Sequence, residues 1–314
     1  MSLTGPACGP GASQNFPASA EVSGRPRWRV AFDQMSAWAE WGWDALRRLG
    51  PVVYADDGIY GVPAYYVTRR EDILAAALDT EALVRVDDLF PPRYRRIVEP
   101  LLVPSALNED MPAELRRRAA AVIRTAAPGD LGNAFAAQVF LALCGIAHER
   151  ELPQAISERR TWLLAALTDQ LDGDAQVIDA LREVINAGFI GVAYAAQFAI
   201  VDLSNNPALA DELRADPSSI AAFVDDLLRN RSPIPTIVRR ATGATRIAGV
   251  DIPQGAQVEL CIGALGHSPG HLEFGAGTHR CIGRHLSTPA LTVFVGEWLD
   301  HVAAGDAWWP KMLG

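Results

Sequence analysis

One cysteine in this sequence has the surroundings expected of a metal-ligating thiol. Cys281 lies near the end of a glycine-containing run, Phe274–Gly283, which precedes a predicted helix that begins at about Arg284. Glycines let a backbone approach a flat partner closely or hold a positive φ. The N–H groups of a first helical turn stabilise a nearby thiolate. A loop of this kind is suited to present a cysteine sulfur as the axial ligand of a metal.

Two plainer interpretations of this cysteine stay open. It could be a buried structural cysteine, which is the usual role of an isolated one. It could also belong to a zinc site, since several possible ligands gather in this part of the chain: His267, His271, His279, Cys281 and His285. Their spacing lacks the short paired-ligand pattern of zinc sites, so the axial-ligand interpretation is favoured.

The loop resembles the ligand loop of the cytochrome P-450 family, which follows the pattern F-G-x-G-x-H-x-C-x-G. All six fixed positions are present, as Phe274, Gly275, Gly277, His279, Cys281 and Gly283. The resemblance implies that these residues bind haem b (iron protoporphyrin IX) and that Cys281 is the iron ligand. It also implies that Phe274 and His279 contact the haem and that the glycines keep the loop compact.

Two arginines and an acid–arginine pair extend this resemblance. The segment around Arg239 is similar to a β segment of the family, which implies that its guanidinium binds a haem propionate. Arg95 fits the arginine position of a helix that supplies further propionate contacts. Asp226 and Arg229 match the family's E-x-x-R helix, with aspartate in the glutamate position. Their i, i+3 spacing places both on one helix face, and we expect a buried pair behind the haem.

The predicted central helix departs from the family. Ala187–Val192 aligns with A-G-x-[D/E]-T-[T/S], whose acid and alcohol relay the protons needed for dioxygen activation. Ile190 and Gly191 occupy those two catalytic positions, and Val184–Val201 contains no Asp, Glu, Ser or Thr. The side chains left there for hydrogen bonding are Asn186, Tyr194 and Gln197. Proton delivery is therefore the uncertain step of the implied reaction.

Three functions are compatible with these residues. The resemblance implies a haem-thiolate monooxygenase that inserts one oxygen atom into a small apolar organic substrate and takes electrons from a ferredoxin-type donor. The missing acid–alcohol pair leaves open a peroxide-driven or non-redox haem-thiolate enzyme, because peroxide brings its own protons and electrons. The shortening of the chain relative to the family leaves open a non-catalytic haem-binding protein.

The composition predicts a cytoplasmic protein with neither a nucleic-acid nor a membrane partner. The 28 Lys and Arg residues against 37 Asp and Glu give a net charge of −9, which argues against binding to a phosphate backbone. The four cysteines are widely spread, as in a reducing compartment. Met1–Pro26 shows no export signal, and the longest apolar stretch, Ala187–Val201, is short for a membrane span.

Helical periodicity dominates the chain, which predicts a mainly α fold with a minor β part. We expect a compressed P-450-like fold around a long central helix, Ala175–Asn205, with residues 28–314 as one haem-binding domain and 1–27 as a flexible tail. The other predicted helices are Ser36–Leu49, Arg70–Leu78, Tyr94–Leu102, Ala113–Thr125, Ala134–Cys144, Arg159–Leu171, Pro207–Ala215, Ser219–Arg229 and Arg284–His301. The predicted β segments are Val52–Thr68, Val238–Thr242, Thr245–Ile247 and Gln257–Ile262.

Overall fold

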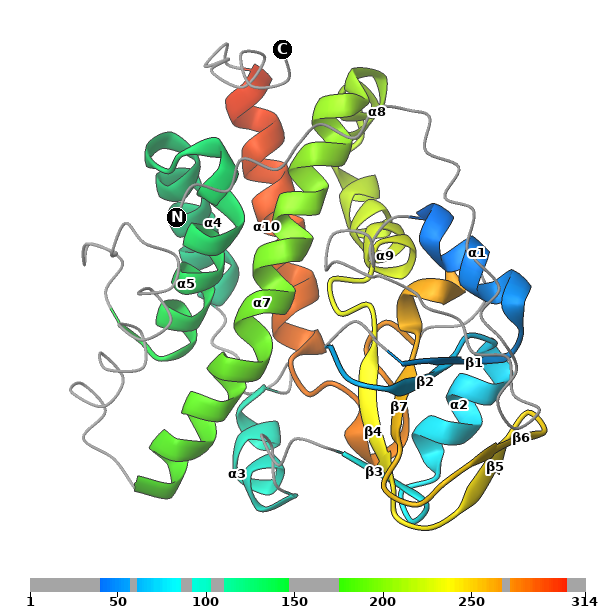
Figure 1. Cartoon of the computed structure of the whole chain (residues 1–314). Helices are drawn as coiled ribbons and strands as arrows, with labels where there is room; N and C mark the ends of the chain where they lie inside the picture. The colour runs from blue at the N-terminus through cyan, green and yellow to red at the C-terminus, as the bar shows by residue number, and fades with distance from the viewer. Residues whose placement is uncertain are drawn as a thin grey trace.

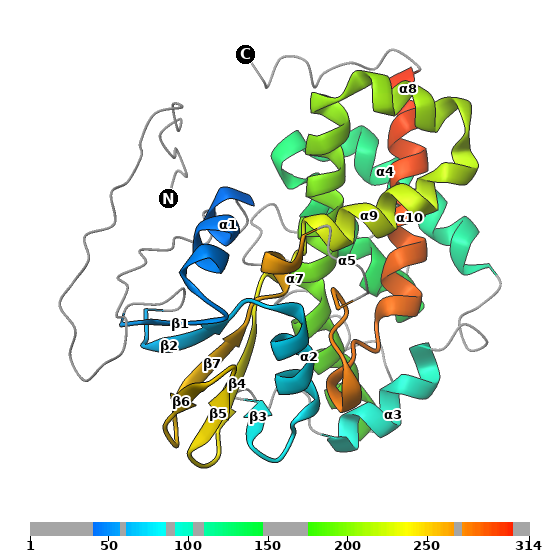
Figure 2. The ribbon, with the colours of Figure 1, turned by 90° about the vertical axis from the view of Figure 1, so that its right-hand side faces the viewer.

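The computed structural model of this chain describes residues 40–56, 61–85, 92–102, 110–146, 175–266 and 272–303. Most helices gather in one part of the molecule and the strands in another, and these two parts lie side by side (Figures 1 and 2). The predicted tail 1–27 and the predicted helix Arg159–Leu171 lie outside the described residues. The mainly α fold with a minor β part is confirmed.

The long helix α7 (Ala175–Asn205) runs through the helical part, with the bounds that the sequence predicts (Figure 1). Helix α5 (Leu131–Leu143) packs against it and is buried on nearly every side. Gly132 allows this close approach, because a Cβ there would lie 2.1 Å from the carbonyl oxygen of Ala193. The Gly132 N–H also donates to Gln197 Oε1 at 3.4 Å.

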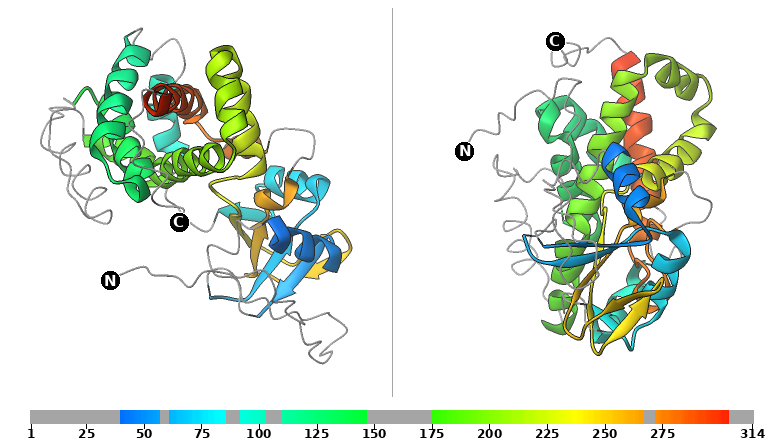
Figure 3. Two further views of the ribbon diagram at one scale, coloured as in Figure 1. Left: turned by 90° about the horizontal axis from the view of Figure 1, so that it is seen from above. Right: turned by 45° about the vertical axis from the view of Figure 1, so that its right-hand side comes forward.

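The remaining helices of this part surround α7. Helices α4 (Met111–Thr125) and α10 (Arg284–Ala303) pack against each other, and α10 also contacts α7 (Figure 3). They share one large apolar core with α5 and α7. The other helices of this part are α3 (Pro92–Leu102), α8 (Pro207–Ala215) and α9 (Ile220–Asn230).

The strands form a five-stranded sheet in the order β1-β2-β7-β4-β3. These strands are β1 (Val52–Ala55), β2 (Ala64–Val67), β3 (Leu83–Arg85), β4 (Ile237–Ala241) and β7 (Gln257–Leu260). Helices α1 (Glu40–Leu49) and α2 (Arg70–Leu78) pack beside this sheet. A separate hairpin joins β5 (Thr245–Ile247) to β6 (Val250–Ile252), and neither β3 nor β6 is predicted from the sequence.

The expectation of a buried pair between Asp226 and Arg229 is wrong. The two side chains lie 3.4 Å apart on α9, but they are 60% and 28% exposed. The spacing places both groups on one helix face, as expected, and that face meets solvent, because the apolar face of α9 turns Val224 and Leu228 towards the core.

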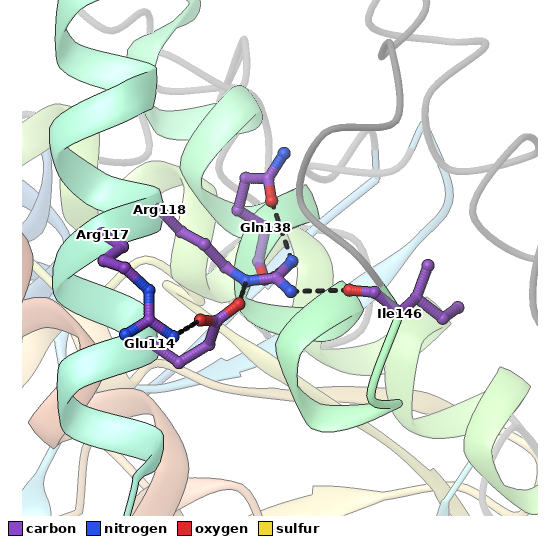
Figure 4. Close-up of polar contacts among 5 residues, drawn as sticks. All are labelled: Glu114, Arg117, Arg118, Gln138 and Ile146. Carbon is purple, nitrogen blue, oxygen red and sulfur yellow. Dashed lines mark hydrogen bonds and ion pairs between the residues drawn. The ribbon is translucent and has the colours of Figure 1, made fainter.

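A different acid–arginine pair is buried, and the sequence did not single it out. Arg118 on α4 is 3% exposed and donates from Nε to Glu114 Oε1 at 2.5 Å (Figure 4). Its Nη1 donates to Gln138 Oε1 at 2.9 Å and its Nη2 to the carbonyl oxygen of Ile146 at 2.6 Å. The guanidinium therefore ties α4 to α5 and to the turn that follows α5.

Part of α7 is long and apolar enough to cross a membrane, by length and composition alone. The stretch is Ile178–Asn205, and 59% of its most apolar window is buried inside the protein. Core helices of soluble proteins pass the same test. The apolar character of α7 is accounted for by its packing against α3, α5, α9 and α10.

Candidate functional site

A cavity of about 270 Å³ lies between α7 and the cysteine loop. The loop wall is formed by lining residues of Phe274–Gly283, and the helix wall by Val184, Ala187, Gly188, Gly191 and Val192 of α7. The cavity is completed by side chains from α3, α5, α9, α10, β3, β4 and the segment before β4.

The loop wall has its backbone held in place by two glycines and by hydrogen bonds. Gly275 and Gly277 have φ of +70° and +64°, which is the left-handed region that glycine adopts without strain. A Cβ on Gly277 would also lie 2.9 Å from Leu78 Cδ2. The Cys281 N–H donates to the Phe274 carbonyl oxygen at 2.7 Å, which closes the loop. These two glycine positions therefore cannot take a larger residue without distortion.

Cys281 is accessible from the cavity and enclosed by protein on its other sides. This enclosure raises the pKa of the thiol, because the charged form loses water. The backbone N–H groups of Gly283 and Arg284, together with the charge of Arg95, act in the opposite direction and lower the pKa. The net effect is a raised pKa, so the groups at the start of α10 offset only part of the cost of removing the thiolate from water.

The other loop residues named from the sequence lie around this sulfur. Phe274, Gly275, His279 and Gly283 all line the cavity. Gly277 does not line it and instead packs against α2. The sequence prediction is therefore supported for the position of the cysteine and its close neighbours, while Gly277 has a packing role.

The two predicted propionate arginines differ in position. Arg95 lines the cavity and is fixed by Glu99, to whose carboxylate it donates from Nε and Nη2, both at 3.1 Å. Its Nη1 donates to the Arg280 carbonyl oxygen at 2.7 Å, which joins α3 to the loop wall. Arg239 on β4 is only 2% exposed and is not a lining residue. The residue paired with it on β3, Arg85, does line the cavity.

The prediction that Ile190 belongs to the catalytic site is wrong, whereas Gly191 faces the cavity. Ile190 is 41% exposed and does not line the cavity. The α-helix turns by about 100° per residue, and this rotation carries Ile190 away from the side of α7 that holds Ala187, Gly188 and Gly191. A Cβ on Gly191 would meet no atom within 4 Å, so the helix wall has room at this position.

The polar residues of α7 named from the sequence do not replace the missing acid and alcohol. Tyr194 stacks on Phe198 with ring centroids 6.2 Å apart, and Gln197 accepts from the Gly132 N–H. Neither residue lines the cavity. The side chain of Asn186 lies outside the described part of the structure. The described lining residues of α7 carry no carboxylate and no hydroxyl.

Four polar lining residues were missed from the sequence: Arg85, Glu273, Arg280 and Ser287. Arg85 belongs to a three-residue strand with no alternating pattern to reveal it. Glu273 adjoins the loop motif and Ser287 lies one turn into α10. Both are close to Cys281 along the chain, and this closeness could have predicted that they line the cavity.

The alternative interpretations of the cysteine find little support among the described residues. No group of three or more His, Cys, Asp or Glu side chains that could hold a metal ion occurs in this part of the chain. His267 and His271 lie outside it. Of the other described cysteines, Cys261 is buried and Cys144 is half-buried, and burial raises the pKa of the Cys144 thiol to about 12.

A haem fits the residues that line this cavity. A sulfur opens into it from the loop wall, and the opposite helix wall carries alanine and glycine at three of its five positions, which leaves space for a flat group. Arginines line it at Arg85 and Arg95, and guanidinium groups match the carboxylates that haem carries. Cys281 would hold the iron and the arginines the carboxylates.

Comparisons with known proteins find similarity over part of the chain. No family model matches the chain. It is 26% identical over 164 residues to cytochrome P-450-terp of Pseudomonas sp, and the aligned part covers 45% of this chain and 38% of that protein. It is 28% identical over 185 residues to cytochrome P-450 107B1 of Saccharopolyspora erythraea, which is 51% of this chain and 46% of that protein. The matched part thus spans less than half the length of either relative.

The same fold is found among solved structures. CYP108D1 from Novosphingobium aromaticivorans superposes with a TM-score of 0.66 at 18% identity, over 83% of this chain and 86% of that one. CYP109B1 from Bacillus subtilis superposes with a TM-score of 0.66 at 16% identity, over 84% of this chain and 92% of that one. The similarity to these structures establishes the fold, and the loop motif lies at the cavity within it. The chain has the fold of solved cytochrome P-450 structures, and about half of it is similar in sequence to curated proteins of that family.

Proposed function

We propose that this protein is a haem-thiolate monooxygenase that inserts one oxygen atom into a small apolar organic substrate. Residues 28–314 act as one haem-binding domain in the cytoplasm, and the cofactor is haem b with Cys281 as its iron ligand. The observation that carries this proposal is the Cys281 sulfur, which opens into a cavity opposite Gly191 of α7. When bound, the haem supplies the iron chemistry that activates oxygen.

The remaining lining supports an apolar substrate. Away from the loop wall the cavity is bounded mainly by aliphatic and aromatic side chains: Leu102, Phe140, Val184, Val192, Leu228 and Ile234. Such surfaces bind through removal of apolar area from water and give little directional recognition. This lining would accept a range of small apolar molecules.

Cationic side chains near Cys281 support an acidic electron donor of the ferredoxin type. Arg96, Arg280 and His285 are exposed, and Arg284 is half-buried. Arg95 contacts Arg280, so these groups come from one surface formed by α3, the loop wall and the start of α10. Clustered charge of one sign guides the encounter with a partner of opposite charge, although the whole chain is acidic.

Peroxide is the second candidate oxidant, favoured by the helix wall. The described lining residues of α7 offer neither an acid nor an alcohol to pass protons into the cavity. A positioned proton donor contributes about 10²–10⁴-fold to such a step. Hydrogen peroxide carries the two protons and two electrons that the dioxygen route has to collect separately.

The first test is the absorption spectrum of the reduced, CO-bound protein. Thiolate ligation predicts a strongly red-shifted Soret band, and its absence from haem-loaded protein would contradict the proposal. The second test compares hydrogen peroxide with a surrogate ferredoxin chain in the oxidation of fluorogenic apolar probes. More product per haem with peroxide favours the second candidate, whereas tightly coupled turnover with the electron chain excludes it.

A further inference from the structure

Two arginines face each other on neighbouring strands at the edge of the sheet. Strand β3 pairs antiparallel with β4, and Arg85 lies directly opposite Arg239 in this register. Directly opposed residues place their side chains on the same face of a sheet, with Cβ atoms about 4.5–5.5 Å apart. Val84 is opposed to Arg240 in the same way, on the other face.

The face that carries Arg85 and Arg239 is the one that borders the cavity. Arg85 is itself a lining residue, and so is Ile237, which precedes Arg239 by two positions on β4 and shares its face. The loop wall comes close to this strand, because a Cβ on Gly275 would lie 3.8 Å from Ile237 Cδ1. The arginine pair therefore lies on the sheet face that bounds the cavity.

Two guanidinium groups in such a position favour an anion. Like charges directly opposite each other destabilise a strand pair, and the cost is greater where one of them is buried, as Arg239 is. Both residues already take part in other interactions within the protein, to which an anion would add. A carboxylate suits the pair, because each guanidinium can donate two parallel hydrogen bonds to it.

We propose that Arg85 binds a propionate carboxylate of the haem, next to Arg239. The inference rests on the proposed haem site and adds to it a residue on the edge strand β3. Arg85 is a positioning residue: it holds one edge of the cofactor while Cys281 holds the iron. A carboxylate on a substrate is the other source of this chemistry, and the experiment separates the two.

The experiment measures the rate of haem release from the loaded protein to excess apomyoglobin. Arg85→Gln keeps much of the side-chain length but removes the charge and the two-pronged donor. We expect release about tenfold faster than from the unaltered protein, since a charge-assisted hydrogen bond of the usual strength is lost. Arg240→Gln is the matched control, because Arg240 is exposed on the opposite face of β4, and its release rate should stay within about twofold.

A second measurement uses protein reconstituted with haem dimethyl ester, in which both carboxylates are blocked. Arg85→Gln should then release the ester as slowly as the unaltered protein does. If Arg85→Gln speeds the loss of both cofactors equally, Arg85 acts on the fold alone and the proposal is wrong. If it speeds the loss of neither, Arg85 does not hold a propionate, and a fatty-acid titration would show whether it binds a substrate carboxylate.

Two further outcomes keep this test separate from the proposed function. If Arg85→Gln does not fold, Arg85→Lys is used, which keeps the charge but cannot donate two parallel hydrogen bonds to one carboxylate. Its haem release rate should lie between that of the unaltered protein and a tenfold increase. A rate equal to that of the unaltered protein would overturn the proposal. If the unaltered protein retains haem but lacks the red-shifted CO band, thiolate ligation fails while the propionate contact is still measured by release. Failure to bind any haem would overturn both.

Discussion

The loop wall and the helix wall line the same cavity, but their shapes depend on different parts of the chain. The loop wall depends on its backbone, since Gly275 and Gly277 have positive φ and the Cys281 N–H closes the loop on Phe274. The helix wall depends on single side chains, and at Gly191 there is none. Binding a cofactor and supplying protons to it are thus separate requirements, and a chain can keep the first while losing the residues for the second.

Removing the sulfur of the loop wall should have the largest effect. Cys281→Ala should abolish the red-shifted CO band and most haem retention, because no other described cysteine lines the cavity. The absorption spectrum after reduction and CO addition measures this directly. Cys261→Ala and Cys144→Ala remove thiols outside the cavity and should leave the spectrum unchanged. A thiolate-type spectrum in Cys281→Ala would disprove the assignment of the ligand.

Two acid–arginine pairs of the helical part should differ in their importance for stability. Arg118 on α4 holds α5, which packs on the helix wall, whereas Arg229 lies on α9, which packs on α10. Arg118→Ala should lower the free energy of unfolding by about 3 kcal/mol, because Glu114 and Gln138 lose a buried partner. Arg229→Ala should cost less than about 1 kcal/mol. Urea unfolding of the two variants measures the difference, and equal losses would contradict it.

The Arg118 pair also predicts a dependence on pH. Burial raises the pKa of the Glu114 carboxyl, but hydrogen bonds from Arg118 and Arg117 outweigh this effect and hold the pKa below its ordinary value. A carboxyl whose pKa is lowered by folding stabilises the protein above its unfolded pKa, and this stability is lost as pH falls through the folded value. The difference in unfolding free energy between unaltered protein and Arg118→Ala should therefore shrink below about pH 4.5.

Adding a hydroxyl to the helix wall should sharpen the comparison. Gly191→Thr directs a new side chain into space where no atom lies within 4 Å of the Cβ position. We expect the fraction of electrons recovered in product to rise by about tenfold, below the full effect of a positioned acid and base. Ile190→Glu is the matched control, since its side chain points away from the cavity and should leave coupling unchanged. An equal gain from Ile190→Glu would contradict this account of the helix wall.

A smaller difference is expected when each wall receives one methyl group. Gly277→Ala should cost about 1–3 kcal/mol, because φ there is +64° and the new Cβ would lie 2.9 Å from Leu78. Gly191→Ala should stabilise α7 by up to about 1 kcal/mol, since alanine is the better helix former and meets no atom there. Thermal unfolding of the haem-free forms gives both values. A destabilised Gly191→Ala would mean that the helix wall is closed at this position.

The parts of the fold that the sequence predicts are those with local signals. The bounds of α7 match because its periodicity ends at Asn206, whose side chain caps the next helix by accepting from the Leu209 N–H at 3.3 Å. Strand β3 has three residues and pairs with a segment about 150 positions further along the chain, so nothing near it in sequence reveals it. The pairing of Arg85 with Arg239 is invisible for the same reason.

The candidate site divides in a similar way. The loop motif predicts Cys281 and its lining neighbours, because consecutive residues of one turn must lie together. The sequence does not give the rotation of α7, so it cannot tell that Gly191 faces the cavity and Ile190 does not. It places Asp226 and Arg229 on a common helix face without showing whether that face is covered. The direction in which a helix face points depends on how the helix packs against other elements, and a local sequence pattern does not contain this information.

The contact at Gly132 has a mechanical consequence for the cavity. A backbone carbonyl of α7 occupies the notch left by the missing side chain, and Gln197 is bonded beside it. If α7 slid along its axis, the carbonyl oxygen of Ala193 would clash with the residues of α5 on either side of Gly132. The axial position of α7 relative to α5 is therefore fixed. The helix wall is thus held in place. Any widening of the cavity that admits a molecule then requires movement of the elements that face α7.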